Sequence, residues 1–384
     1  MSIKRFMPGF LLAAALASCI QDEALNKEAA IDACTGTDVQ FTNPFSDNSG
    51  YYVYVNREAD LSSQTLTFTV PDGATIATAD TGAGDTAFTR NDDGTYTATL
   101  DFDNDSHARR LTVTSEDGTN RATCVIDIIR MELPTYYHFE ELQTSDPYHV
   151  LMDMEAGITS DGLQRVLLWS SGNPGFELTR EASTPEDYPT VRVSGGRAGY
   201  CAKLETCDTG AFGAMVGMYI AAGNLFVGSF DLTNALNDAL GSTKFGVQFY
   251  EEPVSLHGYY KYKRGEVYTE SGQTVDGKQV SFHIYAMLYE ADDPSFMLNG
   301  ANGLTDDSIV LLAQMDEADA VEADEWTEFE ITFEQKNNKT VDAQRLSEGK
   351  YKLGIVFTSS RDGGNFSGAV GSTLWVDEVE LTCK

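Results

Sequence analysis

Strict alternation of apolar and polar residues dominates the first third of the chain. Leu66, Phe68 and Val70 alternate with threonines, and the same two-residue period runs through residues 96–102. A period of two places one face of a strand against a core and leaves the other face in solvent. Turn residues such as the Pro-Asp-Gly at 71–73 separate these segments at the spacing of a small sandwich. Residues 31–130 are therefore predicted to form one β-sandwich.

A second, larger unit is predicted from residue 131 to the carboxyl terminus. Its predicted strands cover residues 136–142, 200–206, 225–232, 245–250, 280–289, 327–334, 351–358 and 373–382. Only residues 233–240 have a helical pattern. Strand 280–289 carries large side chains on both faces, which is expected of a central strand that is covered on both sides or lines a groove. The fold class predicted for the whole chain is all-β, with a small sandwich followed by a larger one.

The first residues have the pattern of an export signal. Lys4 and Arg5 precede an apolar stretch, residues 10–16, that is shorter than the roughly 20 residues a membrane-spanning helix needs. This stretch ends in Leu-Ala-Ser-Cys, which resembles the lipobox of bacterial lipoproteins. The resemblance implies that residues 1–18 are a signal peptide and that Cys19 is the site of lipid attachment.

The residues after the lipobox indicate where such a lipoprotein resides. Residues 19–30 are mostly polar, which is typical of a tether. The Gln-Asp-Glu at 21–23 looks like the acidic surface-export tract of Bacteroidota lipoproteins. We therefore expect a cell-surface protein that its lipid anchors in the outer membrane.

Composition narrows the expected partners. Among 384 residues the chain has 59 acidic and 26 basic side chains, and the resulting formal charge of −33 would repel nucleic-acid phosphates. Nucleic acid is therefore not an expected partner. With 42% hydrophobic residues the chain can build real cores, so a largely disordered protein is excluded as well.

Cysteine usage suggests one disulfide. Export permits disulfides, and Cys34 and Cys124 fall near the first and last strands of the first unit. Because the first and last strands of such sandwiches commonly lie close together, we predict that these two cysteines are paired.

Four sequence blocks in the second unit resemble one family. They are WSSGNPG at 169–175, GNLFVG at 223–228, PVSLHGYYKYKRG at 253–265 and SSRDGGNFSGAVGSTLWVDEVEL at 359–381. In this order they resemble the putative carbohydrate metabolism domain of Bacteroidota lipoproteins, over most of residues 131–384. The resemblance implies a jelly-roll sandwich akin to carbohydrate-binding modules behind an immunoglobulin-like (Ig-like) domain. Residues 111–129 are similar to the closing hairpin of such Ig-like domains.

Catalytic patterns are weak by comparison. A glycoside hydrolase needs two carboxylates roughly 5 to 10 Å apart across the scissile bond. No compact motif in the sequence selects such a pair, and neither HExxH nor GxSxG occurs. A glycoside hydrolase therefore stays an alternative, as does a structural or adhesive surface protein without a sugar site.

The predicted glycan site combines a tyrosine cluster with a polar loop. Sugar rings stack on aromatic side chains, and their hydroxyls need polar partners. The predicted site residues are Tyr259, Tyr260, Tyr262, Arg361, Asp362 and Asn365. The opposing interpretation makes the tyrosines packing residues of the sandwich. The predicted function is binding of polysaccharide or oligosaccharide during its capture or processing, with other surface glycan-utilisation proteins as further partners.

A structural calcium ion is the one cofactor that the sequence suggests. Asp377 shares strand parity with residues that look buried, and a buried carboxylate needs partners. Carbohydrate-binding jelly rolls often hold calcium between their first and last strands, so Glu140 and Asp377 are the candidate ligands. The alternative is an aspartate bonded to backbone amides.

Trp169 is expected in the core rather than in a binding platform.

Overall fold

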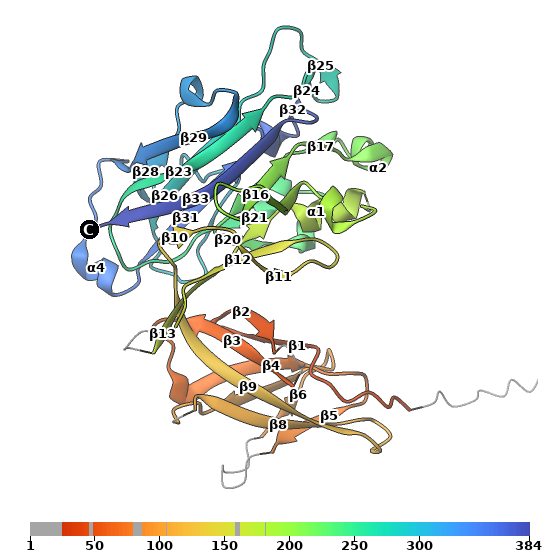
Figure 1. Ribbon diagram of the computed structural model, residues 1–384. Helices are drawn as coiled ribbons and strands as arrows, with labels where there is room; N and C mark the ends of the chain where they lie inside the picture. The colour runs from red at the N-terminus through yellow and green to blue at the C-terminus, as the bar shows by residue number, and fades with distance from the viewer. Residues whose placement is uncertain (1–24, 46–48, 80–86, 105, 158–161, 181) are drawn as a thin grey trace, which may run out of the picture.

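The computed structural model describes residues 25–384 except 46–48, 80–86, 105, 158–161 and 181. The predicted signal peptide and Cys19 lie outside the described residues. The chain forms two stacked β units, which strand β9 (Arg121–Glu132) joins (Figure 1). Strands dominate both units, which confirms the predicted all-β fold class. None of the described helices is long and apolar enough to cross a membrane.

The first unit is a sandwich of two sheets around one apolar core. One sheet has the order β1 (Ala33–Gly36), β4 (Gln64–Thr69), β7 (Tyr96–Leu100) and β6 (Thr89–Arg90); the other has the order β2 (Val39–Pro44), β3 (Gly50–Asn56), β9, β8 (Ala108–Thr114) and β5 (Thr75–Thr78). Leu66 and Phe68 are fully buried, whereas Thr65 and Thr67 bond to threonines across the strand pair, both at 3.0 Å. The predicted alternation is confirmed, while the Ig-like assignment stays a prediction.

The predicted disulfide is not formed in this core. Cys34 on β1 and Cys124 on β9 are both buried in the core and both are free thiols. Burial raises the pKa of Cys34 to about 12 and that of Cys124 to about 11, so both stay protonated. In this state they pack as small apolar side chains, and the sequence prediction is corrected accordingly.

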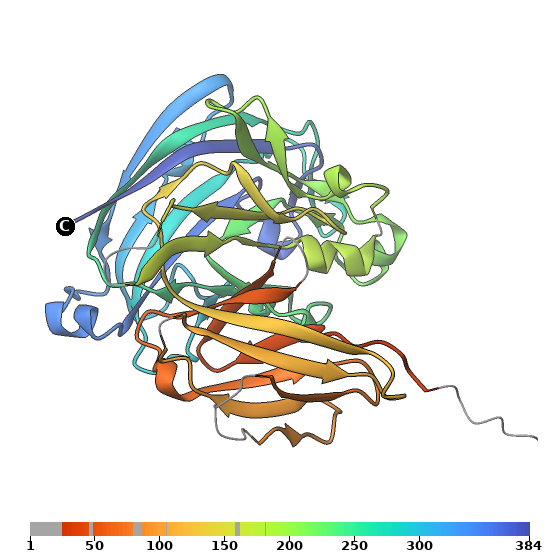
Figure 2. The same cartoon turned by 60° about the horizontal axis from the view of Figure 1, so that its bottom comes forward.

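The second unit is a larger sandwich of two sheets, named here by their positions in Figure 1. The front sheet has the order β15 (Thr190–Ser194), β16 (Tyr200–Glu205), β33 (Thr373–Cys383), β23 (Pro253–Lys263) and β29 (Ala323–Thr332), with β10 (Tyr136–Tyr137) also on β33. The back sheet has the order β14 (Ser170–Ser171), β19 (Asn224–Phe226), β31 (Tyr351–Thr358), β26 (His283–Glu290), β28 (Ile309–Gln314) and β30 (Glu334–Gln335), with β22 (Val247–Gln248) also on β31. The long strands β23, β29 and β33 arch across the sandwich (Figure 2).

Shorter elements surround this sandwich. The helices are α1 (Asn173–Thr179), α2 (Gly210–Met215), α3 (Ala239–Ser242) and α4 (Ala343–Ser347). The remaining strands are β11 (Glu141–Thr144), β12 (Val150–Met154), β13 (Leu163–Leu168), β17 (Cys207–Asp208), β18 (Ile220–Ala221), β20 (Gly228–Phe230), β21 (Thr243–Phe245), β24 (Tyr268–Glu270), β25 (Gln273–Thr274), β27 (Leu298–Asn299) and β32 (Gly368–Ala369). Together with their loops, α1, α3 and β21 cover the outer side of the back sheet.

Strand β26 has the two covered faces that its sequence predicts. Ile284 and Ala286 belong to the core between the two sheets. Tyr285 and Met287 alternate with them and belong to a second apolar cluster on the outer side of the back sheet. The loops on that side therefore pack on a sheet that is already apolar on its outer face.

Two other predicted elements are interrupted or shorter than expected. The strand predicted at 136–142 is split into β10 and β11, because Phe139 between them adopts a φ of +55° that no strand can contain. The helix predicted at 233–240 is a 3-10 turn at 232–234 followed by the single turn of α3.

The two units share one sheet at their junction. β9 pairs in parallel with β3 of the first unit, and its last residues pair in parallel with β13 of the second, Arg130 opposite Leu163. Glu132 ends β9 and accepts hydrogen bonds from Arg57 and from Arg165, both at 2.9 Å. The predicted boundary at residue 130 thus falls inside a continuous strand.

Candidate functional site

A pocket of about 340 Å³ opens on the outer side of the back sheet. Its floor is formed by side chains of three neighbouring strands: Phe226 from β19, His283 and Tyr285 from β26, and Val356 and Thr358 from β31. The cavity falls within the roughly 300 to 1,000 Å³ that is typical of small-ligand sites. We call it the back-sheet pocket.

Loops from distant parts of the chain wall the pocket. Its walls contain residues of α1, of the segment 235–240, of the loop 300–305 and of the loop 360–366. Asn173 fixes the start of α1, because its side chain donates to Thr190 O at 2.7 Å and accepts from Thr190 N at 3.0 Å. Gly175 on α1 allows close packing, since a Cβ there would lie 2.9 Å from the ring of Phe230. Most of the wall is apolar.

A few polar side chains converge in this apolar setting. Asn224 accepts a hydrogen bond from Gly172 N at 2.7 Å, which ties the start of α1 to β19. Burial lowers the pKa of His283 to about 3, so its ring is neutral at ordinary pH. Its Nε2 accepts from the amide of Gln314 at 3.1 Å, and the ring proton therefore resides on Nδ1. His283 can thus donate one hydrogen bond from Nδ1.

Arg361 is the one charged side chain among the described residues that line the pocket. Its backbone N–H donates to Ser281 O at 2.8 Å, and its Nη2 donates to Met315 O at 3.1 Å. Its Nε is buried without a hydrogen-bond partner. Burial lowers the pKa of the guanidinium, which nevertheless stays charged at neutral pH.

Two of the three predicted platform tyrosines are core residues. Tyr260 is 2% exposed and Tyr262 is 1% exposed, and both rings pack on Phe282 with centroids 4.7 and 4.8 Å away. The cause is strand parity, because both side chains point inward from β23 on the same face as Leu256. The prediction that they stack on a sugar is wrong, and the packing interpretation holds for them.

Tyr259 points the other way, onto the outer face of the front sheet. There the guanidinium of Arg197 lies 3.6 Å from its ring centroid, and the ring makes an edge contact with His257. His257 in turn pairs with Glu328 at 2.7 Å. Tyr259 and Arg361 therefore lie on opposite outer faces of the sandwich and cannot form one site.

The three predicted residues of the glycine-rich loop, Arg361, Asp362 and Asn365, do not share one site either. The carboxylate of Asp362 accepts from the hydroxyl of Tyr268 at 2.6 Å and pairs with Lys278 at 3.1 Å. Asn365 is exposed in the 3-10 turn at 363–365 and does not line the pocket. Of the six predicted glycan-binding residues, only Arg361 reaches the back-sheet pocket.

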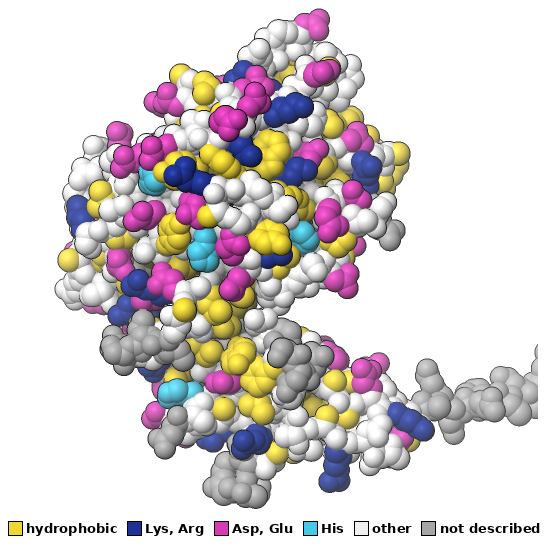
Figure 3. All heavy atoms as spheres, in the orientation of Figure 1, with side chains coloured by type: hydrophobic (Ala, Val, Ile, Leu, Met, Phe, Trp, Pro, Cys, Tyr) yellow, Lys and Arg dark blue, Asp and Glu magenta, His cyan; other side chains and the backbone are white. Residues whose placement is uncertain are grey.

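The sequence interpretation also missed a row of side chains across the front sheet. Lys203, Trp375 and Lys261 stand opposite one another on β16, β33 and β23. The ammonium of Lys261 lies 4.6 Å from the ring centroid of Trp326 on β29 and 5.8 Å from that of Trp375. Figure 3 shows Lys and Arg side chains interleaved with apolar ones on this face. The alternation along each strand indicates which of these side chains point outward. That they lie next to one another can be recognised only when the order of the strands is known.

Glu140 and Asp377 meet at the same hairpin, but not as a calcium site. Asp377 accepts backbone hydrogen bonds from Arg197 at 2.6 Å, Ala198 at 3.3 Å and Glu378 at 2.9 Å. Glu140 accepts from Tyr200 N at 2.9 Å. Burial raises the pKa of Asp377 to about 6 despite these donors. The described residues contain no group of three or more His, Cys, Asp or Glu side chains that could hold a metal ion.

The correction for these two carboxylates has a simple physical reason. Both organise the tight turn between β15 and β16, where a Cβ at Gly196 would lie 2.7 Å from Asp377 Oδ2 and one at Gly199 would lie 2.2 Å from Glu140 Oε1. Their oxygens are aimed at backbone N–H groups, which is the alternative that the sequence left open. Trp169 is buried, as predicted, and its indole N–H donates to Asp153 at 2.7 Å.

Comparison with known proteins matches this chain to one family and to several solved structures. The family model described as "putative carbohydrate metabolism domain" matches residues 138–382. A crystal structure described as a putative glycoside hydrolase from Bacteroides thetaiotaomicron VPI-5482 is 39% identical, covers 95% of this chain and 99% of its own, and has a TM-score of 0.71. One with the same description from Bacteroides vulgatus ATCC 8482 is 43% identical, covers 66% of this chain and 99% of its own, and has a TM-score of 0.61. No protein with a curated description matches the sequence.

Proposed function

The chain belongs to the family described as the putative carbohydrate metabolism domain, and on that premise we propose that it binds glycan in the back-sheet pocket. The observation that carries the proposal is the composition of this pocket. Apolar rings and aliphatic walls suit the C–H faces of a sugar ring, while Asn224, His283 and Arg361 supply polar groups for its substituents.

The same composition favours binding over hydrolysis. Hydrolysis by the usual mechanism needs a general acid and a second carboxylate on either side of the glycosidic bond. None of the described residues that line the pocket is an aspartate or a glutamate. Because the two similar structures are each described as a "putative glycoside hydrolase", a hydrolase is the second candidate for this chain.

A blocking substitution tests the location of the site. Ala301 lies exposed in the loop that lines the pocket, so Ala301→Trp should fill the cavity without disturbing the core. We expect binding to any glycan identified on an array of neutral, uronate-bearing and sulfated oligosaccharides to weaken by about tenfold or more, which corresponds to about 1.4 kcal/mol. Titration calorimetry with the array ligand measures the change.

The matched control lies on the opposite face. Trp375→Ala removes one of the two tryptophan rings beside Lys261 on the front sheet and should leave the affinity unchanged. If Trp375→Ala abolishes binding and Ala301→Trp does not, the front sheet is the binding surface and the pocket assignment is wrong. Release of new reducing ends from the bound glycan would favour the hydrolase.

The proposed setting is the outer surface of the cell, where the protein would hold glycan during capture or processing. The lipobox-like sequence before Cys19 and the acidic tract after it support this location. Metabolic labelling with palmitate should mark the wild-type protein and should fail for Cys19→Ala. An unlabelled wild-type protein would remove the anchor from the proposal.

A further inference from the structure

The charge distribution of the back-sheet pocket has a feature that glycan binding alone does not explain. The chain has 59 acidic side chains against 26 basic ones, yet the one charged side chain among the described lining residues is a cation. The other polar side chains that line the pocket are neutral, among them Asn224, His283 and several threonines. A site built for neutral hydroxyls does not need an arginine at this position.

The protein also provides few hydrogen-bond acceptors for the guanidinium of Arg361. Of its five N–H donors, one bonds to the carbonyl of Met315 and the Nε–H is buried without an acceptor. No carboxylate of the described residues forms an ion pair with it. Asp362 is next in sequence, but its carboxylate is occupied by Lys278 and Tyr268.

Two further acidic residues lie near Arg361 without neutralising it by contact. Asp316 and Glu317 are exposed, and with Asp362 they act on the guanidinium through space. A half-buried cation in an apolar cavity carries a desolvation cost that distant, solvated carboxylates offset only in part. An anionic group bound inside the pocket would supply acceptors to the guanidinium at close range.

We propose that the back-sheet pocket selects a sugar residue bearing an anionic group, a carboxylate or a sulfate ester, which binds Arg361 while the sugar ring packs on the apolar walls. The inference rests on the proposed glycan binding at this pocket and adds the class of ligand. Guanidinium groups recognise both anions through paired N–H donors. His283 can donate one further hydrogen bond from its neutral Nδ1–H. Arg361 would then be the only cation of the described lining residues that the bound anion contacts.

The net charge of the protein limits the form of this ligand. At long range a chain with a charge of −33 repels polyanions, whereas at 0.15 M salt the screening length is about 8 Å. Short oligosaccharides with one terminal anion should therefore bind better than long polyanionic chains.

The experiment compares matched ligands on the wild-type protein by titration calorimetry at 0.15 M salt. One arm uses disaccharides ending in galacturonate or glucuronate against their methyl esters; the other uses O-sulfated galactose disaccharides against the unsulfated forms. We expect the anionic member of at least one pair to bind roughly 10- to 100-fold more tightly, the range for a hydrogen bond to a charged group. The arm that responds identifies the anion as carboxylate or sulfate.

Variants assign this preference to the pocket. Arg361→Gln should abolish the preference while leaving weak binding of the neutral ligand, and Arg361→Lys should retain part of it. Arg90→Gln changes the net charge equally on an exposed strand of the first unit and should keep the full preference. Equal affinity within both ligand pairs, or a preference that survives Arg361→Gln, would overturn the inference and leave glycan binding standing. If no glycan binds the wild-type protein, the proposed function itself fails.

Discussion

Replacing Tyr262 with alanine should lower the free energy of unfolding by about 3 to 5 kcal/mol, the usual cost of removing a buried aromatic side chain. The ring lies between the two sheets against Phe282, and its hydroxyl donates to Ser359 O at 3.2 Å. The substitution therefore leaves a cavity and an unsatisfied carbonyl in the centre of the second unit. Urea denaturation followed by tryptophan fluorescence measures the loss.

Tyr259 provides a matched control on the same strand. Its ring is on the outer face, where its main partner is the guanidinium of Arg197, and such contacts contribute about 1 kcal/mol or less at exposed sites. Tyr259→Ala should accordingly be only slightly destabilising. Similar losses for the two variants would show that the assignment of inward and outward faces on β23 is wrong.

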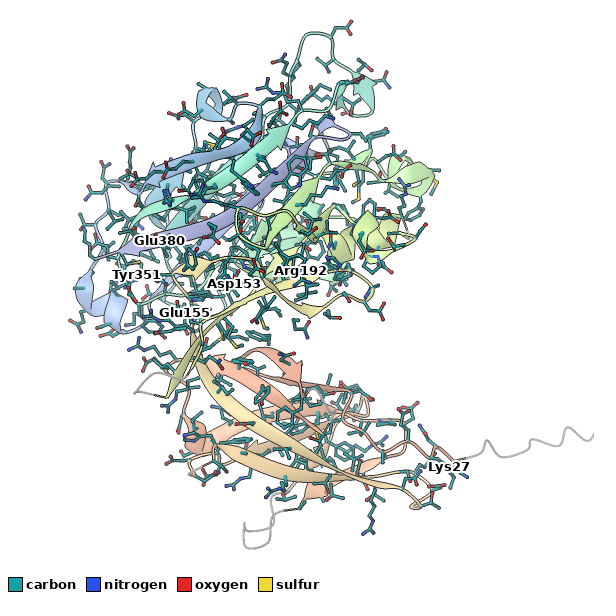
Figure 4. The ribbon with its side chains drawn as sticks, viewed as in Figure 1. Lys27, Asp153, Glu155, Arg192, Tyr351 and Glu380 are labelled. Atoms are coloured by element: carbon teal, nitrogen blue, oxygen red, sulfur yellow. The ribbon has the colours of Figure 1, made fainter. Side chains whose placement is uncertain are left out.

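Asp153→Ala should have an effect of similar size, a loss of about 3 kcal/mol or more. The carboxylate is fully buried and accepts hydrogen bonds from His138 N and Phe139 N, both at 2.9 Å, and from the indole of Trp169 at 2.7 Å. Figure 4 shows its position near the start of the second unit. Each donor left without an acceptor costs about 1 to 3 kcal/mol. Burial raises the pKa of Asp153, so relief of this desolvation offsets part of the loss.

A double-mutant cycle separates the indole from the backbone donors. Trp169→Phe removes the indole N–H, so Asp153→Ala in that background should cost less than in the wild type. Thermal unfolding by calorimetry gives the four stabilities. Strict additivity of the two substitutions would mean that the Trp169–Asp153 hydrogen bond contributes nothing to stability.

The strands of this protein could be predicted because the side chains along each strand follow a regular pattern of buried and exposed positions. The alternation around Leu66 and Phe68 reflects one wet and one dry face, and the unbroken apolar pattern of β26 reflects two covered faces. Both patterns are local, so a single sequence contains them. The break at Phe139 was not predictable in the same way, because a positive φ at a phenylalanine is imposed by its tertiary surroundings.

The candidate site could be predicted only in part. Tyr259, Tyr260 and Tyr262 look alike as a cluster, yet parity with Leu256 directs two of them into the core. The pocket itself is assembled from segments between residues 172 and 366 that are far apart in sequence and meet only in the folded chain. Arg361 was identifiable as a polar residue in a glycine-rich loop, whereas the side chains of β26 that line the same pocket, His283 and Tyr285, were not.

The strand shared by the two units determines how the pocket can move. A hinge between the units would have to break the pairing of β9 with β13 and separate Glu132 from Arg57 and Arg165. Independent swinging of the second unit would therefore break these contacts, which favour one angle between the pocket and the first unit. While they hold, the pocket turns toward a ligand only as the whole two-unit body rotates.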